Sequence, residues 1–180
     1  MTRAGIVRRI DDLGRIVIPK EIRRTLRIAE GTPLEIFTDR EGEIILKKYS
    51  PIGEMTPFVK QYAESIAQVS GKTVLIADRD QFIATAGGHK ELLEKPLSRE
   101  LEDKMMQRES IMASRNDRDF VKISGSGGEE IEELIMNPII SQGDVIGAVM
   151  IASHDNKKRM GDVELALTLA AAGFLGRQME

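Results

Sequence analysis

The pattern of apolar residues changes near residue 50 of this 180-residue chain, and this change divides the chain into two small domains. Residues 1–50 contain short stretches of alternating apolar and polar residues, which are typical of strands, and one short helical stretch. Longer helical patterns and longer apolar runs begin after Ser50-Pro51-Ile52-Gly53. We therefore predict one domain over residues 1–50, a linker at residues 51–55 and a second domain over residues 56–180.

The first domain is too small to bury a large core alone. Its pattern predicts strands over residues 4–11 and 15–18, a helix over residues 20–27, and a hairpin over residues 33–49. A unit of this size struggles to remove enough apolar surface from water. We therefore expect it to fold as an obligate homodimer, in which two chains share one core.

The second domain follows the order helix, two strands, short helices, three strands, helix. Long helices are predicted over residues 56–70 and 162–179, with short helices near residues 90–94 and 98–108. Strands are predicted over residues 73–77, 81–86, 120–123, 134–140 and 145–153. This order indicates an α+β domain whose sheet has helices on its faces or ends.

Basic residues gather at the start of the chain, although the chain as a whole is acidic. The formal net charge is −3, but residues 1–27 contain eight Arg or Lys and only three Asp or Glu. A local positive field can attract a polyanion whatever the total charge, and a guanidinium group can bind phosphate or guanine through two hydrogen bonds. Taken alone, the same residues also fit a solvated surface paired with Asp11, Asp12 and Glu21.

The segment from Gly5 to Leu26, continued by Leu34-Glu35-Ile36 and Ile45 to Tyr49, closely resembles the DNA-binding domain of AbrB-like transition-state regulators. The resemblance implies a swapped-hairpin β-barrel dimer that binds double-stranded DNA. The arginines that match the family's DNA contacts are Arg8, Arg15, Arg23 and Arg24. Arg9 takes the place of another basic residue in close relatives and is included as a fifth candidate. Contacts made mostly to the DNA backbone and to its shape imply a loose sequence preference.

The second domain resembles GAF-type domains in the order of its elements and in the run from Val145 to Ile151. Together the two domains are similar to regulators of late spore development in endospore-forming bacteria. This similarity implies a role in sporulation and a homotetramer held through C-terminal helices. GAF-type domains often bind small molecules, so we favour sensing combined with oligomerisation over oligomerisation alone. Neither the effector nor its pocket residues are indicated, and no other cofactor is expected.

No set of residues points to catalysis or to a metal site, so we expect neither an enzyme nor a metalloprotein. The chain has no cysteine, and His89 and His154 are predicted to lie in surface loops, without the sequence spacing of metal ligands. The Ser124–Gly128 segment lacks the Lys-Ser/Thr ending of a phosphate-binding loop and is predicted to be a flexible loop. No signal peptide or membrane span is recognised, which predicts a cytoplasmic protein without a membrane partner.

An antitoxin is the alternative function. A similar swapped-hairpin domain forms the DNA-binding half of some antitoxins, whose C-terminal part neutralises a toxin protein. Those C-terminal parts are usually short and poorly ordered, whereas this chain has a full set of predicted strands and helices after residue 55. We therefore favour the transcriptional regulator, and copurification of a small partner protein would favour the antitoxin.

Overall fold

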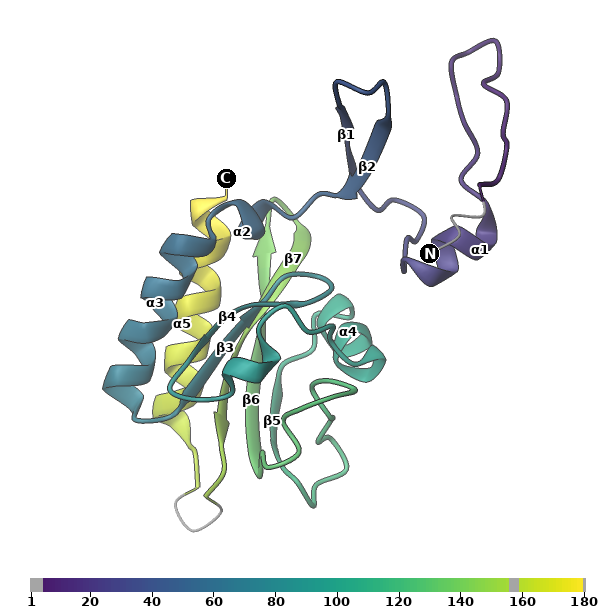
Figure 1. Ribbon diagram of the computed structural model, residues 1–180. Coiled ribbons are helices and arrows are strands. Elements are labelled where there is room, and N and C mark those ends of the chain that lie inside the picture. Colours follow the sequence, from purple (N-terminus) through teal and green to yellow (C-terminus); the bar gives the residue numbers. More distant parts are fainter. Residues whose placement is uncertain (1–4, 156–158, 180) are drawn as a thin grey trace. The chain divides into compact units, whose positions relative to one another are not determined.

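The computed structural model describes residues 5–155 and 159–179, and it consists of two compact units, Met1–Tyr49 and Ser50–Glu180 (Figure 1). The first unit contains helix α1 (Lys20–Thr25) and an antiparallel hairpin of β1 (Leu34–Thr38) and β2 (Ile44–Lys48). The predicted helix and hairpin are therefore confirmed, each slightly shorter than expected.

The other two strands predicted in the first unit do not form in the single chain. Residues 5–10 and 15–18 are extended but belong to no sheet, and residue 4 lies outside the described residues. One backbone hydrogen bond, from the Asp11 amide to the Arg15 carbonyl, joins the two segments. A strand needs a neighbouring backbone to bond with, and among residues 5–49 these segments have none beyond that turn.

Apolar side chains of the first unit remain in contact with solvent. Within residues 5–49, no Val, Ile, Leu or Phe side chain is buried. The large exposed apolar residues are Ile6, Val7, Ile10, Leu13, Ile16, Val17, Ile22, Leu26, Ile36, Phe37, Ile44 and Leu46. Within residues 5–49 the single chain therefore forms no core of Val, Ile, Leu or Phe side chains, and so much exposed apolar surface is typical of an interaction site.

The second unit is built on a five-stranded antiparallel sheet with the strand order β4-β3-β7-β6-β5. Its strands are β3 (Thr73–Ala77), β4 (Phe82–Ala86), β5 (Ile111–Ser114), β6 (Glu133–Ser141) and β7 (Asp144–Ser153). Its helices are α2 (Pro51–Glu54), α3 (Thr56–Ser70), η1 (Lys90–Leu92), α4 (Arg99–Met106) and α5 (Asp162–Gln178). The predicted α+β architecture, an antiparallel sheet flanked by helices, is confirmed.

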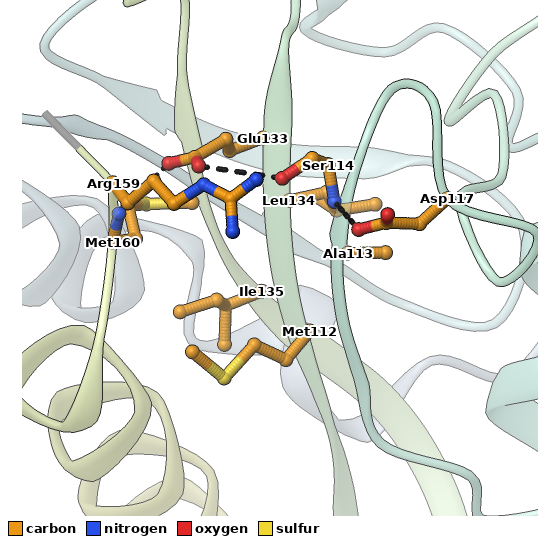
Figure 2. A pocket seen from close by; sticks show the side chains of 9 residues that line it. All are labelled: Met112, Ala113, Ser114, Asp117, Glu133, Leu134, Ile135, Arg159 and Met160. Carbon is orange, nitrogen blue, oxygen red and sulfur yellow. Dashed lines mark hydrogen bonds between the residues drawn. The ribbon is translucent and has the colours of Figure 1, made fainter. Parts of the chain in front are cut away.

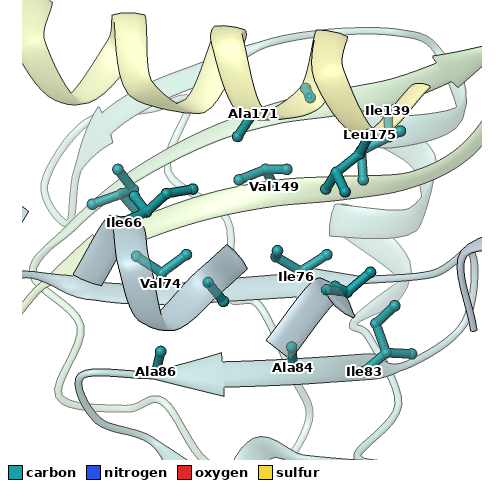
Figure 3. Packing of buried hydrophobic residues seen from close by; sticks show 14 of the residues in the cluster. Ile66, Val74, Ile76, Ile83, Ala84, Ala86, Ile139, Val149, Ala171 and Leu175 are labelled. Atoms are coloured by element: carbon teal, nitrogen blue, oxygen red, sulfur yellow. The ribbon is translucent and has the colours of Figure 1, made fainter. Parts of the chain in front are cut away.

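Apolar residues fill both faces of this sheet. Helices α3 and α5 cover one face, where Val74, Ile76 and Val149 pack against Ala171 and Leu175 (Figure 3). Helix α4 and the segments around it cover the other face. Because both faces are buried, the strands are apolar at nearly every position, as in the uniformly buried β3. No helix in the described part of the chain is both long and apolar enough to cross a membrane.

The linker expected at residues 51–55 is instead a helical turn of the second unit. Helix α2 begins at Pro51, and Ser50 caps it by accepting a hydrogen bond from the Gly53 amide at 3.1 Å. Ile52 is completely buried in the core under α3 and α5. Pro and Gly suggested a flexible connection, but proline also suits the first turn of a helix, and burial of Ile52 fixes this segment to the sheet domain.

The strand expected over residues 120–123 is also wrong, and the edge strand is β5 instead. Val121 and Ile123 are buried, but they belong to a loop that covers the core. The Ile123 carbonyl accepts a hydrogen bond from the Ser98 amide at the start of α4. A loop that alternates buried and exposed residues has the same apolar pattern as a strand, so sequence alone does not separate the two.

Candidate nucleic-acid interface

All five arginines predicted to contact DNA are exposed in the first unit. Arg8 and Arg9 lie in the extended segment before the turn, Arg15 lies at the end of the turn, and Arg23 and Arg24 lie in the last turn of α1. Within the described residues, the guanidinium groups of Arg8, Arg9 and Arg24 have no hydrogen-bond or ion-pair partner. Three positive charges are therefore available to an external anion.

Asp11 organises the turn that presents Arg15. One carboxylate oxygen, Oδ1, accepts hydrogen bonds from the amides of Leu13 at 3.0 Å and Arg15 at 2.7 Å. The other, Oδ2, accepts from Nε of Arg15 at 2.8 Å. Gly14 completes the turn with φ of 76°, a conformation that glycine adopts without steric cost. Asp11 thus orients Arg15 through both its backbone and its side chain.

The pKa of Asp11 is lowered, first by the hydrogen bond from the Arg15 amide and then by the bond from its side chain. Both bonds favour the charged carboxylate. For a lowered pKa, the stabilisation is present above the ordinary pKa of 3.8 and is lost as the pH falls through the lower value of the folded chain. We therefore expect the turn, and the presentation of Arg15, to be independent of pH between about pH 5 and pH 8.

Replacing Asp11 by alanine is expected to lower DNA affinity about tenfold, because three hydrogen bonds that hold the turn and Arg15 are lost together. Fluorescence anisotropy with a labelled duplex measures the change. Asp12→Ala is the matched control, because the Asp12 carboxylate has no hydrogen-bond partner within the described residues. Equal affinities for the two variants would contradict the role assigned to Asp11.

Helix α1 positions the other two arginines. Pro19 precedes its first residue with φ of −56°, which suits the start of a helix. The guanidinium Nε of Arg23 donates back to the Ile18 carbonyl at 3.3 Å, whereas the Arg24 guanidinium extends into solvent. Cations in the last turn also interact favourably with the helix dipole. In the described part of the chain, the side chain of Arg23 thus has a local hydrogen bond that Arg24 lacks.

The two histidines, which the sequence placed in surface loops, lie side by side in the structure. Their ring centroids are 4.6 Å apart, and the His89 side chain is only 7% exposed. Strands β4 and β7 both pair antiparallel with β3, so they run in the same direction. Their C-terminal ends therefore lie at the same end of the sheet, just before His89 and His154. This proximity depends on strand order, which the linear sequence does not reveal.

Each histidine of the pair has a hydrogen-bond partner close to it in the structure. His89 Nδ1 lies 2.6 Å from a Glu91 carboxylate oxygen, and this hydrogen bond is the main cause of a lowered pKa of Glu91. His154 Nδ1 lies 3.2 Å from the Glu130 carbonyl. No group of three or more metal-binding side chains occurs in the described part of the chain.

A small cavity of about 120 Å³ lies where β5, β6 and the segment before α5 meet (Figure 2). The buried Glu133 carboxylate accepts hydrogen bonds there from the Ser114 hydroxyl at 3.4 Å and the Met160 amide at 2.8 Å. The volume of this cavity is well below the roughly 300 Å³ of typical ligand pockets. Glu133 therefore connects these three segments, and its hydrogen bonds explain its burial.

The Ser124–Gly128 segment, predicted to be a flexible loop, forms the wall of another cavity. This cavity has a volume of about 210 Å³ and is also lined by Arg115, Phe120 and Lys122. Arg115 is ion-paired with Glu132 at 2.9 Å. The composition of the loop indicated a turn, but the residues that face it come from elsewhere in the sequence, so sequence reasoning missed the cavity.

Two family models match the chain, one in each unit. Residues 54–180 match the model described as stage V sporulation protein T C-terminal, transcription factor. Residues 7–54 match the model described as antidote-toxin recognition MazE, bacterial antitoxin. The boundary between the two matches lies close to the boundary between the structural units.

Two proteins of Bacillus subtilis (strain 168) are similar in sequence. Stage V sporulation protein T is 53% identical over 181 residues, which cover 100% of this chain and 99% of that protein. Transition state regulatory protein AbrB is 63% identical over 51 residues, which cover 28% of this chain and 52% of that protein. The first similarity extends over both units, whereas the second is confined to a segment the size of the first unit.

Solved structures resemble the second unit. A type II free methionine-R-sulfoxide reductase from Thermoplasma acidophilum has a TM-score of 0.57 at 13% identity, over 71% of this chain and 94% of that chain. The GAF domain of a phosphoenolpyruvate-protein phosphotransferase from Coxiella burnetii has a TM-score of 0.57 at 14% identity, over 69% and 82% of the two chains. At such low identity these structures establish a GAF-type fold and nothing about chemistry.

Proposed function

The chain belongs to the stage V sporulation protein T family of transcription factors, and we propose that it is a DNA-binding transcriptional regulator of sporulation genes. The observation that carries this proposal is the exposed arginine set on a unit without a core of its own. Two copies of that unit form a swapped-hairpin dimer that binds double-stranded DNA. The second unit joins two such dimers into a homotetramer.

The DNA contacts are assigned to Arg8, Arg9, Arg15, Arg23 and Arg24. Their exposure supports this assignment, as does the absence of an internal partner for three of their guanidinium groups in the described residues. Guanidinium groups on a turn and a short helix reach phosphates more readily than they read a fixed series of bases. We therefore expect a sequence-tolerant regulator that distinguishes sites largely by DNA shape.

The dimer is assigned to residues 1–50. The apolar residues exposed in the single chain would form a shared core, and the extended residues 5–10 and 15–18 would gain strand partners from the second copy. The apolar residues are costly to leave exposed because of their contact with water. The segments 5–10 and 15–18 are costly to leave exposed because their backbone groups have no strand partner. A dimer removes both costs at once.

The tetramer is assigned to the outer surfaces of α3 and α5. Helix α5 is rich in apolar residues on every side, including Val163 and Leu169, which are 69% and 51% exposed. An aromatic cluster of Phe58, Tyr62 and Phe174, with centroids 5.3 to 6.2 Å apart, connects the two helices. A helix that is apolar all round is normally buried, and a second copy of the pair would bury this one.

Replacing Leu169 by glutamate is expected to reduce the tetramer to dimers that keep the first-unit interface. A carboxylate in an apolar helix interface is costly to bury, whereas residues 1–50 are unchanged. Sedimentation velocity measures the mass, and a duplex with one site should still be bound. Gln107→Glu places the same charge after α4, on the other side of the sheet, and should leave the tetramer intact. If the Leu169→Glu variant remained a tetramer, the assignment of the interface to α3 and α5 would be wrong.

The second unit is also assigned a sensing role for a small-molecule effector, as its GAF-type fold permits. We assign the protein no enzymatic reaction, since its family is one of transcription factors. A regulator of chromosomal genes acts in the cytoplasm, so we propose that location. The effector would act by binding more tightly to one arrangement of the protein than to another.

An antitoxin remains the second candidate, because residues 7–54 match an antitoxin family model. Cross-linking in sporulating cells, purification of the full chain and sequencing of the recovered DNA would test both ideas. Enrichment of promoter regions without a stoichiometric small protein is expected of the regulator. Recovery of a small protein bound in equal amounts, with DNA only from the gene's own promoter, would favour the antitoxin.

A further inference from the structure

A groove with a volume of about 350 Å³ lies along β4 in the second unit. Strand β4 is at the edge of the sheet. Its outer side pairs with no further strand in the described residues, although Phe82 exchanges backbone hydrogen bonds with Glu94 and Lys95. Residues of α3 and of the segment 90–94 form the other walls. The volume falls within the range of about 300 to 1,000 Å³ typical of small-molecule pockets. The groove shares no lining residue with the cavity at the Ser124–Gly128 loop.

The walls of the groove combine an apolar floor with two cations. Phe82, Ile83 and Ala84 form part of the floor, and Leu93 is a large apolar residue that is 46% exposed. Lys60 and Lys90 line the groove from different elements. A molecule that fits these walls has an apolar body and a negatively charged group.

Neither lysine of the groove is neutralised by a neighbour. Within the described residues, Lys60 and Lys90 have no ion-pair partner, whereas Lys104 pairs with Glu109 at 2.5 Å. Glu94 is the single acidic residue among the described residues that line the groove, and it too makes no ion pair there. The groove therefore has a net positive charge beside an apolar surface.

We propose that this groove binds a small organic anion, whose carboxylate contacts Lys60 and Lys90 and whose apolar body packs against Ile83 and Leu93. A lysine ammonium binds a carboxylate as a compact point charge. Apolar contact with the floor adds affinity that a bare inorganic ion would lack. The site is distinct from the cavity under the Ser124–Gly128 loop.

The groove is also connected to the start of the second unit. The amide of Gln81, a lining residue, donates to Asp78 Oδ1 at 2.8 Å, and Asp78 Oδ2 accepts from the Ser50 hydroxyl at 2.9 Å. On the opposite wall, the Thr56 hydroxyl donates to the Gly53 carbonyl within α2 at 2.6 Å. Both walls thus contact the residues that directly follow the first unit.

An occupant of the groove would therefore bias the conformation of the segment from which the first unit extends. This consequence, unlike the binding itself, rests on the proposed DNA-binding function. An effect on DNA requires that the anion bind one conformation of residues 50–56 more tightly than another. Hexanoate should then change the affinity of the wild-type protein for a duplex, and Asp78→Asn should reduce that change.

Isothermal titration calorimetry of the full chain with hexanoate, in the absence of DNA, tests the site. Hexanoate is expected to bind, and hexanamide, which has the same length but no charge, should bind at least about tenfold more weakly. Lys60→Met and Lys90→Met should each weaken hexanoate binding by about tenfold while keeping the wild-type melting temperature. The control is Lys122→Met, which removes a lysine of the other cavity and should have no effect.

Three outcomes would overturn the proposal. These are no binding of hexanoate at millimolar concentration, equal binding of hexanoate and hexanamide, or a loss of affinity in Lys122→Met but not in the other two variants. The last outcome would move the ligand to the cavity at the Ser124–Gly128 loop. Since no DNA is present, failure of DNA binding would leave these results unaffected.

Discussion

Substitution of both Arg15 and Arg24 by alanine is expected to lower the affinity of the full chain for double-stranded DNA by about a hundredfold or more. Asp11 holds Arg15 at the end of its turn, and the Arg24 guanidinium, at the end of α1, has no partner among the residues that the structure describes. A hydrogen bond to a charged group contributes roughly 1.5 to 3 kcal/mol, and about 1.4 kcal/mol corresponds to a tenfold change in affinity. Anisotropy with a labelled promoter-length duplex at constant salt measures the loss.

The matched control for this double variant is Arg40→Ala. Arg40 is also exposed and basic, and it belongs to the same unit, but it lies at the tip of the β1–β2 hairpin. Its removal should change affinity little, and both variants should keep the mass of the wild-type oligomer. Comparable losses in the two variants would mean that any positive charge on the unit suffices, and the assignment of Arg15 and Arg24 would then fail.

Replacing Ile36 by glutamate is expected to abolish the first-unit dimer and, with it, DNA binding. Ile36 is 70% exposed in the single chain and lies opposite Leu46 on one face of the hairpin. In a shared core the carboxylate of the introduced glutamate would be buried without a partner, which costs several kcal/mol for each chain. Sedimentation velocity should show the tetramer falling to dimers held through α3 and α5, and anisotropy should show little residual binding to the duplex.

Ile36→Val separates the effect of charge from that of shape. Loss of one methylene group in a core typically costs about 0.5 to 1.5 kcal/mol, so this variant should keep both the tetramer and most of its DNA affinity. A normal tetramer in Ile36→Glu would show that this face of the hairpin stays in water. The shared core would then have to be assigned to other apolar residues of the first unit.

The long elements could be predicted from sequence because their patterns are strong. Helix α3 has the bounds that helical spacing indicated, and β3, β6 and β7 stand out as apolar runs between turns. The strand predictions were wrong where the local apolar pattern did not match the position of the segment in the folded domain. Residues 120–123 look like a strand but form a loop over the core, whereas the edge strand β5 has only four residues, two of them buried.

The choice of the five arginines as candidate DNA contacts had a different basis. Its arginines lie close together in sequence, so local charge and a family resemblance were enough to select them. The grouping of His89 with His154, and the groove along β4, depend on which strands are neighbours in the sheet. Residues brought together only by tertiary pairing leave no periodic signal in the chain, which explains why these features emerged from the structure alone.

The salt dependence of DNA binding tests the central claim most directly. The logarithm of the wild-type binding constant should fall steeply and linearly with the logarithm of salt concentration, by roughly 0.9 for each phosphate neutralised. If Arg15 and Arg24 each neutralise one phosphate in both chains of a dimer, their removal should reduce the slope by roughly 3.6. A binding constant that is insensitive to salt, or an unchanged slope in the double variant, would show that the arginines of the first unit are ordinary solvated surface.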